Sequence, residues 1–73
     1  MSGNQGGSPM DNLTYDLIAA LHNKLEAVTA YEKYLKDAGG DQQCQQMFQQ
    51  LMQDDRRHAE MLQRELIRHL SGK

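Results

Sequence analysis

The sequence predicts an all-α protein: an antiparallel hairpin of two long helices that pairs with a second copy of itself to form a four-helix bundle. Three observations predict this fold. Proline occurs once in 73 residues, at Pro9, so no proline interrupts a helix beyond that point. Long stretches consist of Ala, Leu, Gln, Glu, Lys and Arg, all of which favour helix. One break, Gly39-Gly40, divides these stretches into two parts of similar length.

The first expected elements are a leader and a helix. Residues 1–10 are mostly Gly, Ser, Asn and Gln, and we interpret them as a disordered leader that is either natural or added for expression. Asp11 and Asn12 are both good N-cap residues that follow shortly after the proline. We therefore expect the first helix to extend over about residues 12–38.

The turn and the second helix follow directly. Gly39 and Gly40 supply a left-handed cap and a tight turn. Asp41 is a suitable N-cap for a second helix over about residues 41–70, so the helical hairpin occupies residues 11–71. A connection this short forces the two helices to lie antiparallel.

Apolar residues recur at helical spacing along one face of each expected helix. Lys24 lies within the first stripe, Asp55 and His58 lie at the centre of the second, and Ala59 lies at its edge. A lone hairpin would leave part of such wide stripes exposed, so we expect a homodimer or a higher homo-oligomer. The other stripe residues are Leu13, Leu17, Leu21, Val28, Tyr31 and Leu35, with Leu25 at the edge, and Cys44, Met47, Phe48, Leu51, Leu62, Leu66 and His69.

Charge, hydropathy and cysteine content exclude several classes of protein. The net charge is −2 and the charges are interspersed, so no basic face is available for nucleic acid. No apolar run approaches the about 18 residues that span a bilayer, and no signal peptide is evident, so we expect a cytoplasmic protein that binds no membrane. Cys44 is the only cysteine, which excludes a disulfide within the chain. No nucleophile–base pair, phosphate loop or cofactor fingerprint favours an enzyme.

Asp55 and His58 are the polar residues whose position needs a partner. Burying a polar group without one costs about 2–7 kcal/mol. In an antiparallel hairpin that turns at Gly39-Gly40, residues whose numbers sum to about 79 lie at the same height, which places Lys24 level with Asp55. The sequence therefore predicts a polar layer of Lys24, Asp55 and His58 halfway along the hairpin.

The segment from Lys24 to Leu62 resembles the helical pair of the ferritin-like superfamily, found in bacterioferritin, rubrerythrin and the encapsulated ferritins. The first-helix pattern of that family is Glu, then Ala three residues on and Tyr seven on, and here the matching residues are Lys24, Ala27 and Tyr31. The second-helix pattern is Glu-x-x-His and a small residue, and here it reads Asp55-Arg56-Arg57-His58-Ala59. The resemblance implies a half-bundle completed by dimerisation.

Two departures from the family pattern leave two hypotheses. Lys24 stands where the family has a carboxylate, and Asp55 is one methylene shorter than Glu. We therefore expect a homo-oligomeric structural or interaction protein without a cofactor, in which Lys24 and Asp55 neutralise each other and His58 hydrogen-bonds into the layer. An unidentified larger protein is a further candidate partner. The alternative is an iron- or zinc-binding protein, with Asp55 and His58 of two subunits as ligands in a ferroxidase-like site.

Overall fold

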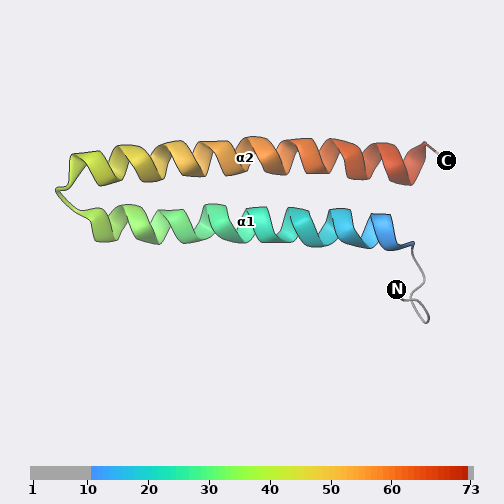
Figure 1. Cartoon of the computed structure of the whole chain (residues 1–73), viewed down its shortest axis with the longest axis horizontal. Coiled ribbons are helices and arrows are strands. Elements are labelled where there is room, and N and C mark those ends of the chain that lie inside the picture. The colour runs from blue at the N-terminus through green and yellow to red at the C-terminus, as the bar shows by residue number, and fades with distance from the viewer. Residues whose placement is uncertain (1–10, 73) are drawn as a thin grey trace.

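The structure is a computed structural model that describes residues 11–72, which form two antiparallel helices joined by a tight turn (Figure 1). Helix α1 spans Asn12–Ala38 and helix α2 spans Gln42–Ser71. The predicted all-α helical hairpin is thus confirmed. The expected leader, residues 1–10, lies outside the described residues. Neither described helix combines the length and the apolar character that crossing a membrane requires.

Aspartate caps begin both helices, and a glycine turn separates them. The carboxylate of Asp11 accepts a hydrogen bond from the amide of Thr14 at 3.1 Å. Asp41 accepts one from the amide of Cys44 at 3.1 Å, and this bond lowers the pKa of Asp41. Asp41 is therefore the N-cap and lies one residue before the helix proper. Gly39 has a φ of 56°, a conformation that side chains with a Cβ rarely adopt, which is why glycine stands at the turn.

The residues that face the opposite helix form a heptad seam, with alternating steps of three and four residues. This 3.5-residue period keeps the same face of each helix turned toward its partner along its whole length. Every seam residue is buried or half-buried. The seam consists of Thr14, Leu17, Leu21, Lys24, Val28, Tyr31, Leu35 and Ala38 in α1, and of Gln45, Phe48, Met52, Asp55, Ala59, Leu62, Leu66 and His69 in α2.

This seam corrects part of the expected apolar stripes. Ala59 was expected at the edge, but it lies in the seam and is only 6% exposed. Leu51 and Leu13 were expected in the stripes, but they are 38% and 53% exposed. The small side chain at position 59 lets the two backbones approach, whereas His58, one residue earlier, is turned to the side.

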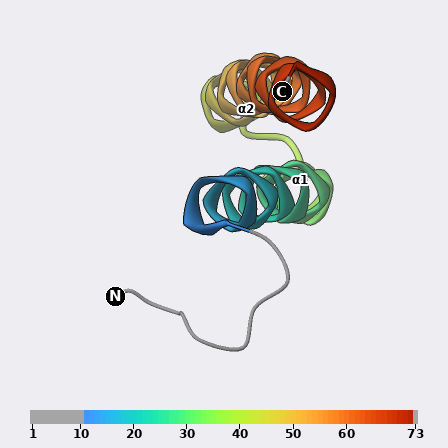
Figure 2. The same ribbon diagram turned by 90° about the vertical axis from the view of Figure 1, so that its right-hand side faces the viewer.

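Seen end-on, the hairpin is a single layer of two helices and therefore has two broad faces (Figure 2). On each broad face, a row of residues borders the seam, and we call these two rows the flanks. The surfaces of the two helices meet on each flank, because one pocket is lined by Tyr34 and Cys44 and another by Leu25 and Gln63. The His58 flank comprises Leu13, Ala20, Ala27, Tyr34, Cys44, Leu51, His58 and Glu65. The Leu25 flank comprises Ile18, Leu25, Glu32, Gln49, Arg56, Gln63 and Leu70.

Three aromatic rings pack together in the half of the hairpin near the turn. The ring centroids of Tyr31 and Phe48 lie 6.1 Å apart, and those of Tyr34 and Phe48 lie 5.6 Å apart. Tyr31 and Tyr34 meet edge to face at 5.5 Å. Because the tyrosines belong to α1 and Phe48 belongs to α2, this cluster joins the two helices where the chain reverses.

Candidate functional site

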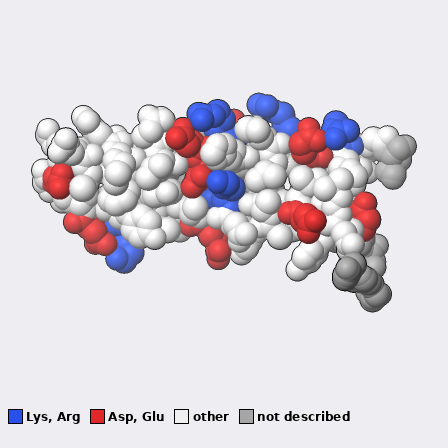
Figure 3. Space-filling model, viewed as in Figure 1, with Lys and Arg blue, Asp and Glu red and all other residues white. Residues whose placement is uncertain are grey.

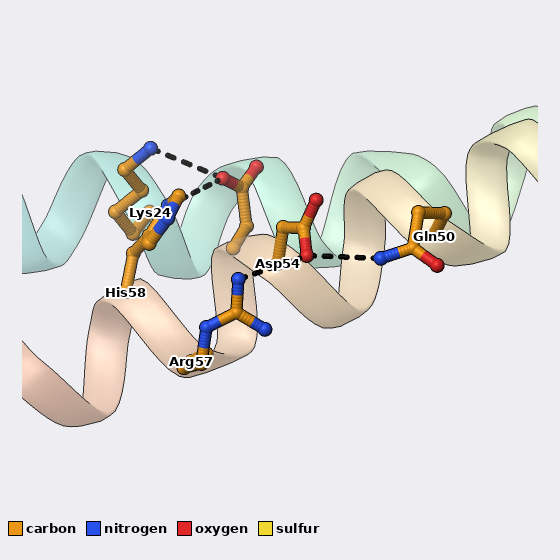
Figure 4. A network of polar contacts seen from close by, with 6 residues as sticks. Lys24, Gln50, Asp54, Arg57 and His58 are labelled. Carbon is orange, nitrogen blue, oxygen red and sulfur yellow. Dashed lines mark hydrogen bonds and ion pairs between the residues drawn. The ribbon is translucent and has the colours of Figure 1, made fainter.

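A polar layer interrupts the apolar seam at the middle of the hairpin. The ammonium Nζ of Lys24 donates a hydrogen bond to Oδ1 of Asp55 at 3.0 Å (Figure 4). The side chain of Asp55 is 14% exposed and that of Lys24 is 38% exposed, so the pair is partly withdrawn from water. The two residues lie at equal height on facing helices, and their charges neutralise each other across the seam.

His58 lies beside this pair without joining it by a hydrogen bond. Its Nδ1 is 3.5 Å from Oδ1 of Asp55, a distance that allows electrostatic attraction if the ring is protonated. The same nitrogen is buried and has no hydrogen-bond partner among the described residues, although the side chain as a whole is 42% exposed. The layer of Lys24 and Asp55 therefore attracts His58 electrostatically at most, and the described residues give its Nδ1 no hydrogen bond.

A second polar network lies on the surface next to the layer. The carboxylate oxygen Oδ1 of Asp54 accepts hydrogen bonds from Gln50 at 3.0 Å and from Arg57 at 3.1 Å (Figure 4). Both contacts lie along α2 and are exposed, so they contribute little to stability. Asp54 is engaged by these neighbours and does not join the layer of Lys24 and Asp55.

One hairpin does not assemble a metal site by itself. Among residues 11–72, no group of three or more His, Cys, Asp or Glu side chains could hold a metal ion. The layer provides one carboxylate and one imidazole, and a lysine already occupies the carboxylate. His22 and Glu26 are 3.4 Å apart on the outer surface of α1, where both side chains are largely exposed to water.

Cys44 lies on the His58 flank near the turn. The neighbouring carboxylate of Asp41 raises the pKa of its thiol, mainly through a hydrogen bond between the two side chains and through charge repulsion of the thiolate. A reactive cysteine needs the opposite environment, one that stabilises the thiolate. The structure therefore gives Cys44 no feature of a catalytic nucleophile.

A contact between the two ends of the described chain was not anticipated from the sequence. The ring Nε2 of His69, in the last turn of α2, lies 3.3 Å from Oδ2 of Asp11, the N-cap of α1. Hydrogen bonds from Thr14 and then from His69 lower the pKa of Asp11 from 3.8 to about 2. The height relation that placed Lys24 opposite Asp55 also places residue 11 opposite residue 69, so it could have revealed this pair.

The Asp11 contact predicts a stability change in acid. Because the folded-state pKa of about 2 lies below the ordinary value of 3.8, ionised Asp11 stabilises the hairpin above that value, and this contribution is lost as the pH falls toward 2. Asp11→Asn keeps a good N-cap but removes the charge. Thermal unfolding at a series of pH values should show a shallower loss of stability for the variant than for the wild type between about pH 4 and 2. Identical profiles would contradict the assignment.

Comparison of the chain with models of protein families, with curated protein sequences and with solved structures found no match in any of the three. The ferritin-like resemblance therefore depends on Lys24, Ala27, Tyr31 and residues 55–59 alone. A two-helix hairpin is common to many unrelated helical proteins, and it does not by itself distinguish one family from another.

Proposed function

We propose that this protein is a homo-oligomeric structural or interaction module, in which two hairpins pair into a ferritin-like four-helix bundle that has no active dinuclear centre. One observation carries the proposal. Among the described residues, a single apolar residue, Ala59, is buried, whereas ten large apolar side chains are exposed. An apolar surface of this extent is typical of a chain that binds another chain. A second hairpin is the simplest way to cover it.

The polar layer supports a structural role over a metal-binding one. Lys24 and Asp55 neutralise each other, so the layer needs no added cation to balance its charge. The ammonium of Lys24 repels a metal ion that approaches Asp55. Partly buried ion pairs of this kind add little net stability, but they oppose alternative registers in which one charge would lose its partner.

Molecular mass measured against concentration tests the proposed dimer. Light scattering and sedimentation equilibrium should give twice the chain mass, and the melting temperature should rise with protein concentration, because dimerisation stabilises only the folded state. A fully helical monomer over about a hundredfold range of concentration would overturn the proposal.

A metal-binding function is the second candidate, and the buried Nδ1 of His58 without a hydrogen bond is the observation that favours it. Two subunits would bring together Asp55 and His58 from each chain, and four such ligands suit a single zinc or iron ion. The resemblance to ferritin-like proteins suggests iron oxidation as the associated chemistry.

Calorimetric titration of the metal-free protein with Zn(II), and anaerobically with Fe(II), tests this candidate. Saturable binding that is lost in His58→Ala and retained in His22→Ala would support it, since His22 belongs to the exposed pair on α1. Lys24→Met should then increase the affinity, because it removes the repelling ammonium. Heats no greater than those of dilution would eliminate the metal-binding function.

A further inference from the structure

We propose that the second copy binds on the His58 flank, so that the two polar layers meet at the centre of the bundle and the Leu25 flank stays at the surface. This inference rests on the proposed homodimer and specifies its interface. Four properties of the described residues support it: charge, side-chain size, the height of the polar layer and the length of the face.

The charges of the two flanks differ. Apart from His58 itself, the His58 flank carries one acidic or basic residue, Glu65, which lies near the open end of the hairpin. The Leu25 flank carries Arg56 at its middle and Glu32 nearer the turn, and its apolar residues Ile18, Leu25 and Leu70 lie between the middle and the open end. Figure 3 shows one broad face on which the half near the turn is mostly free of Lys, Arg, Asp and Glu. Charged groups resist burial, so the His58 flank is the better contact surface.

Side-chain sizes on the His58 flank are complementary. In the middle of the flank, the α1 side presents Ala20 and Ala27, whereas the α2 side presents Leu51, with Met47 one helical turn before it, and Met61 lies one turn beyond His58. Small residues let a neighbouring helix approach closely, and flexible methionines fill the remaining gaps. A two-fold interface requires one surface that complements itself, and two small residues beside larger ones in the middle of the flank satisfy this requirement.

The polar layer lies close to the middle of both helices. Lys24 is 12 residues after Asn12 and 14 before Ala38, and Asp55 is similarly central in Gln42–Ser71. A two-fold axis through this height brings each layer against its copy, so polar groups meet polar groups. Each layer adds one positive and one negative charge, which leaves the combined layer neutral. The unpartnered Nδ1 of His58 then lies among polar groups of both chains.

The length of the face suits a second copy. Helix α1 has 27 residues and helix α2 has 30, so the face is about 40–45 Å long at 1.5 Å per residue. A second copy of this chain matches that face in length, in charge and in the position of its polar layer.

Paired charge substitutions on the two flanks test the interface. Leu51→Glu places a carboxylate on the His58 flank, and Leu25→Glu is the matched control on the other flank, where the wild-type side chain is also exposed. Sedimentation equilibrium should show a dissociation constant raised about 100-fold or more by Leu51→Glu, and little change for Leu25→Glu. A second pair uses bulk in place of charge: Ala27→Trp should also dissociate the dimer, whereas Ala19→Trp, at an exposed position outside both flanks, should not.

The outcomes separate this inference from the function on which it rests. A wild-type chain that stays monomeric overturns the proposed homodimer itself. A wild-type dimer that survives Leu51→Glu and Ala27→Trp but dissociates with Leu25→Glu overturns the interface and leaves the homodimer standing. A dimer that all four variants leave intact also overturns the interface. Dissociation by the two His58-flank variants alone supports both.

Discussion

Replacing Lys24 with Met is expected to lower the free energy of unfolding by about 1–3 kcal/mol, because it leaves a mostly buried carboxylate without its charged partner. The side chain of Asp55 is 14% exposed, and Nζ of Lys24, at 3.0 Å, is its nearest cation. Methionine retains most of the length and the helix propensity of lysine, so the loss reports the missing charge. Urea unfolding followed by circular dichroism at a fixed protein concentration measures the effect.

Two further variants identify the cause. The double variant Lys24→Met/Asp55→Leu should recover most of the lost stability, because replacing both partners of a buried pair with apolar groups is often neutral or stabilising. Lys33→Met removes a pair of similar length, 2.8 Å to Asp37, but both of those side chains are exposed, so little change is expected. Equal stability of Lys24→Met and the wild type would show that the polar layer has no role in holding the hairpin together.

Much of the fold could be predicted because its signals are local. The Gly39-Gly40 turn and the aspartates before each helix fix where the helices begin and end. Once the turn is placed, the antiparallel geometry determines which residues face each other, and this relation correctly predicted that Lys24 contacts Asp55.

The choice of seam in α2 could not be predicted in the same way. Two heptad seams are possible in α2, and both contain Phe48, Asp55 and Leu62. The first seam is completed by residues 45, 52 and 59, and the second by residues 44, 51 and 58. Both sets contain apolar residues, so periodicity does not separate them. In the structure, the first set packs between the two helices and the second set lies on the His58 flank. An apolar stripe predicted from the sequence combines both sets of residues. For this reason His58 was expected in the seam, whereas the structure places it on the flank.

Truncating Phe48 to Ala is expected to cost about 2 kcal/mol, below the about 3–5 kcal/mol that aromatic truncations cost in full cores, because this ring is only half-buried in the hairpin. Phe48 is the α2 member of the aromatic cluster and contacts both Tyr31 and Tyr34. Alanine has the highest helix propensity, so weaker packing accounts for any loss. Thermal and urea unfolding followed by circular dichroism measure the effect.

Tyr15→Ala is the matched control for Phe48→Ala, because it removes an aromatic ring from α1 that is 60% exposed and should change the stability little. Equal effects of the two variants would contradict a role for the cluster in joining the helices. The cluster matters because polar residues interrupt the apolar seam elsewhere: Thr14 and Gln45 lie near its two ends, and Lys24 and Asp55 lie at its centre. Because the large apolar residues of the seam are only half-buried, the loss of the Phe48 ring should weaken the contact between α1 and α2 near the turn.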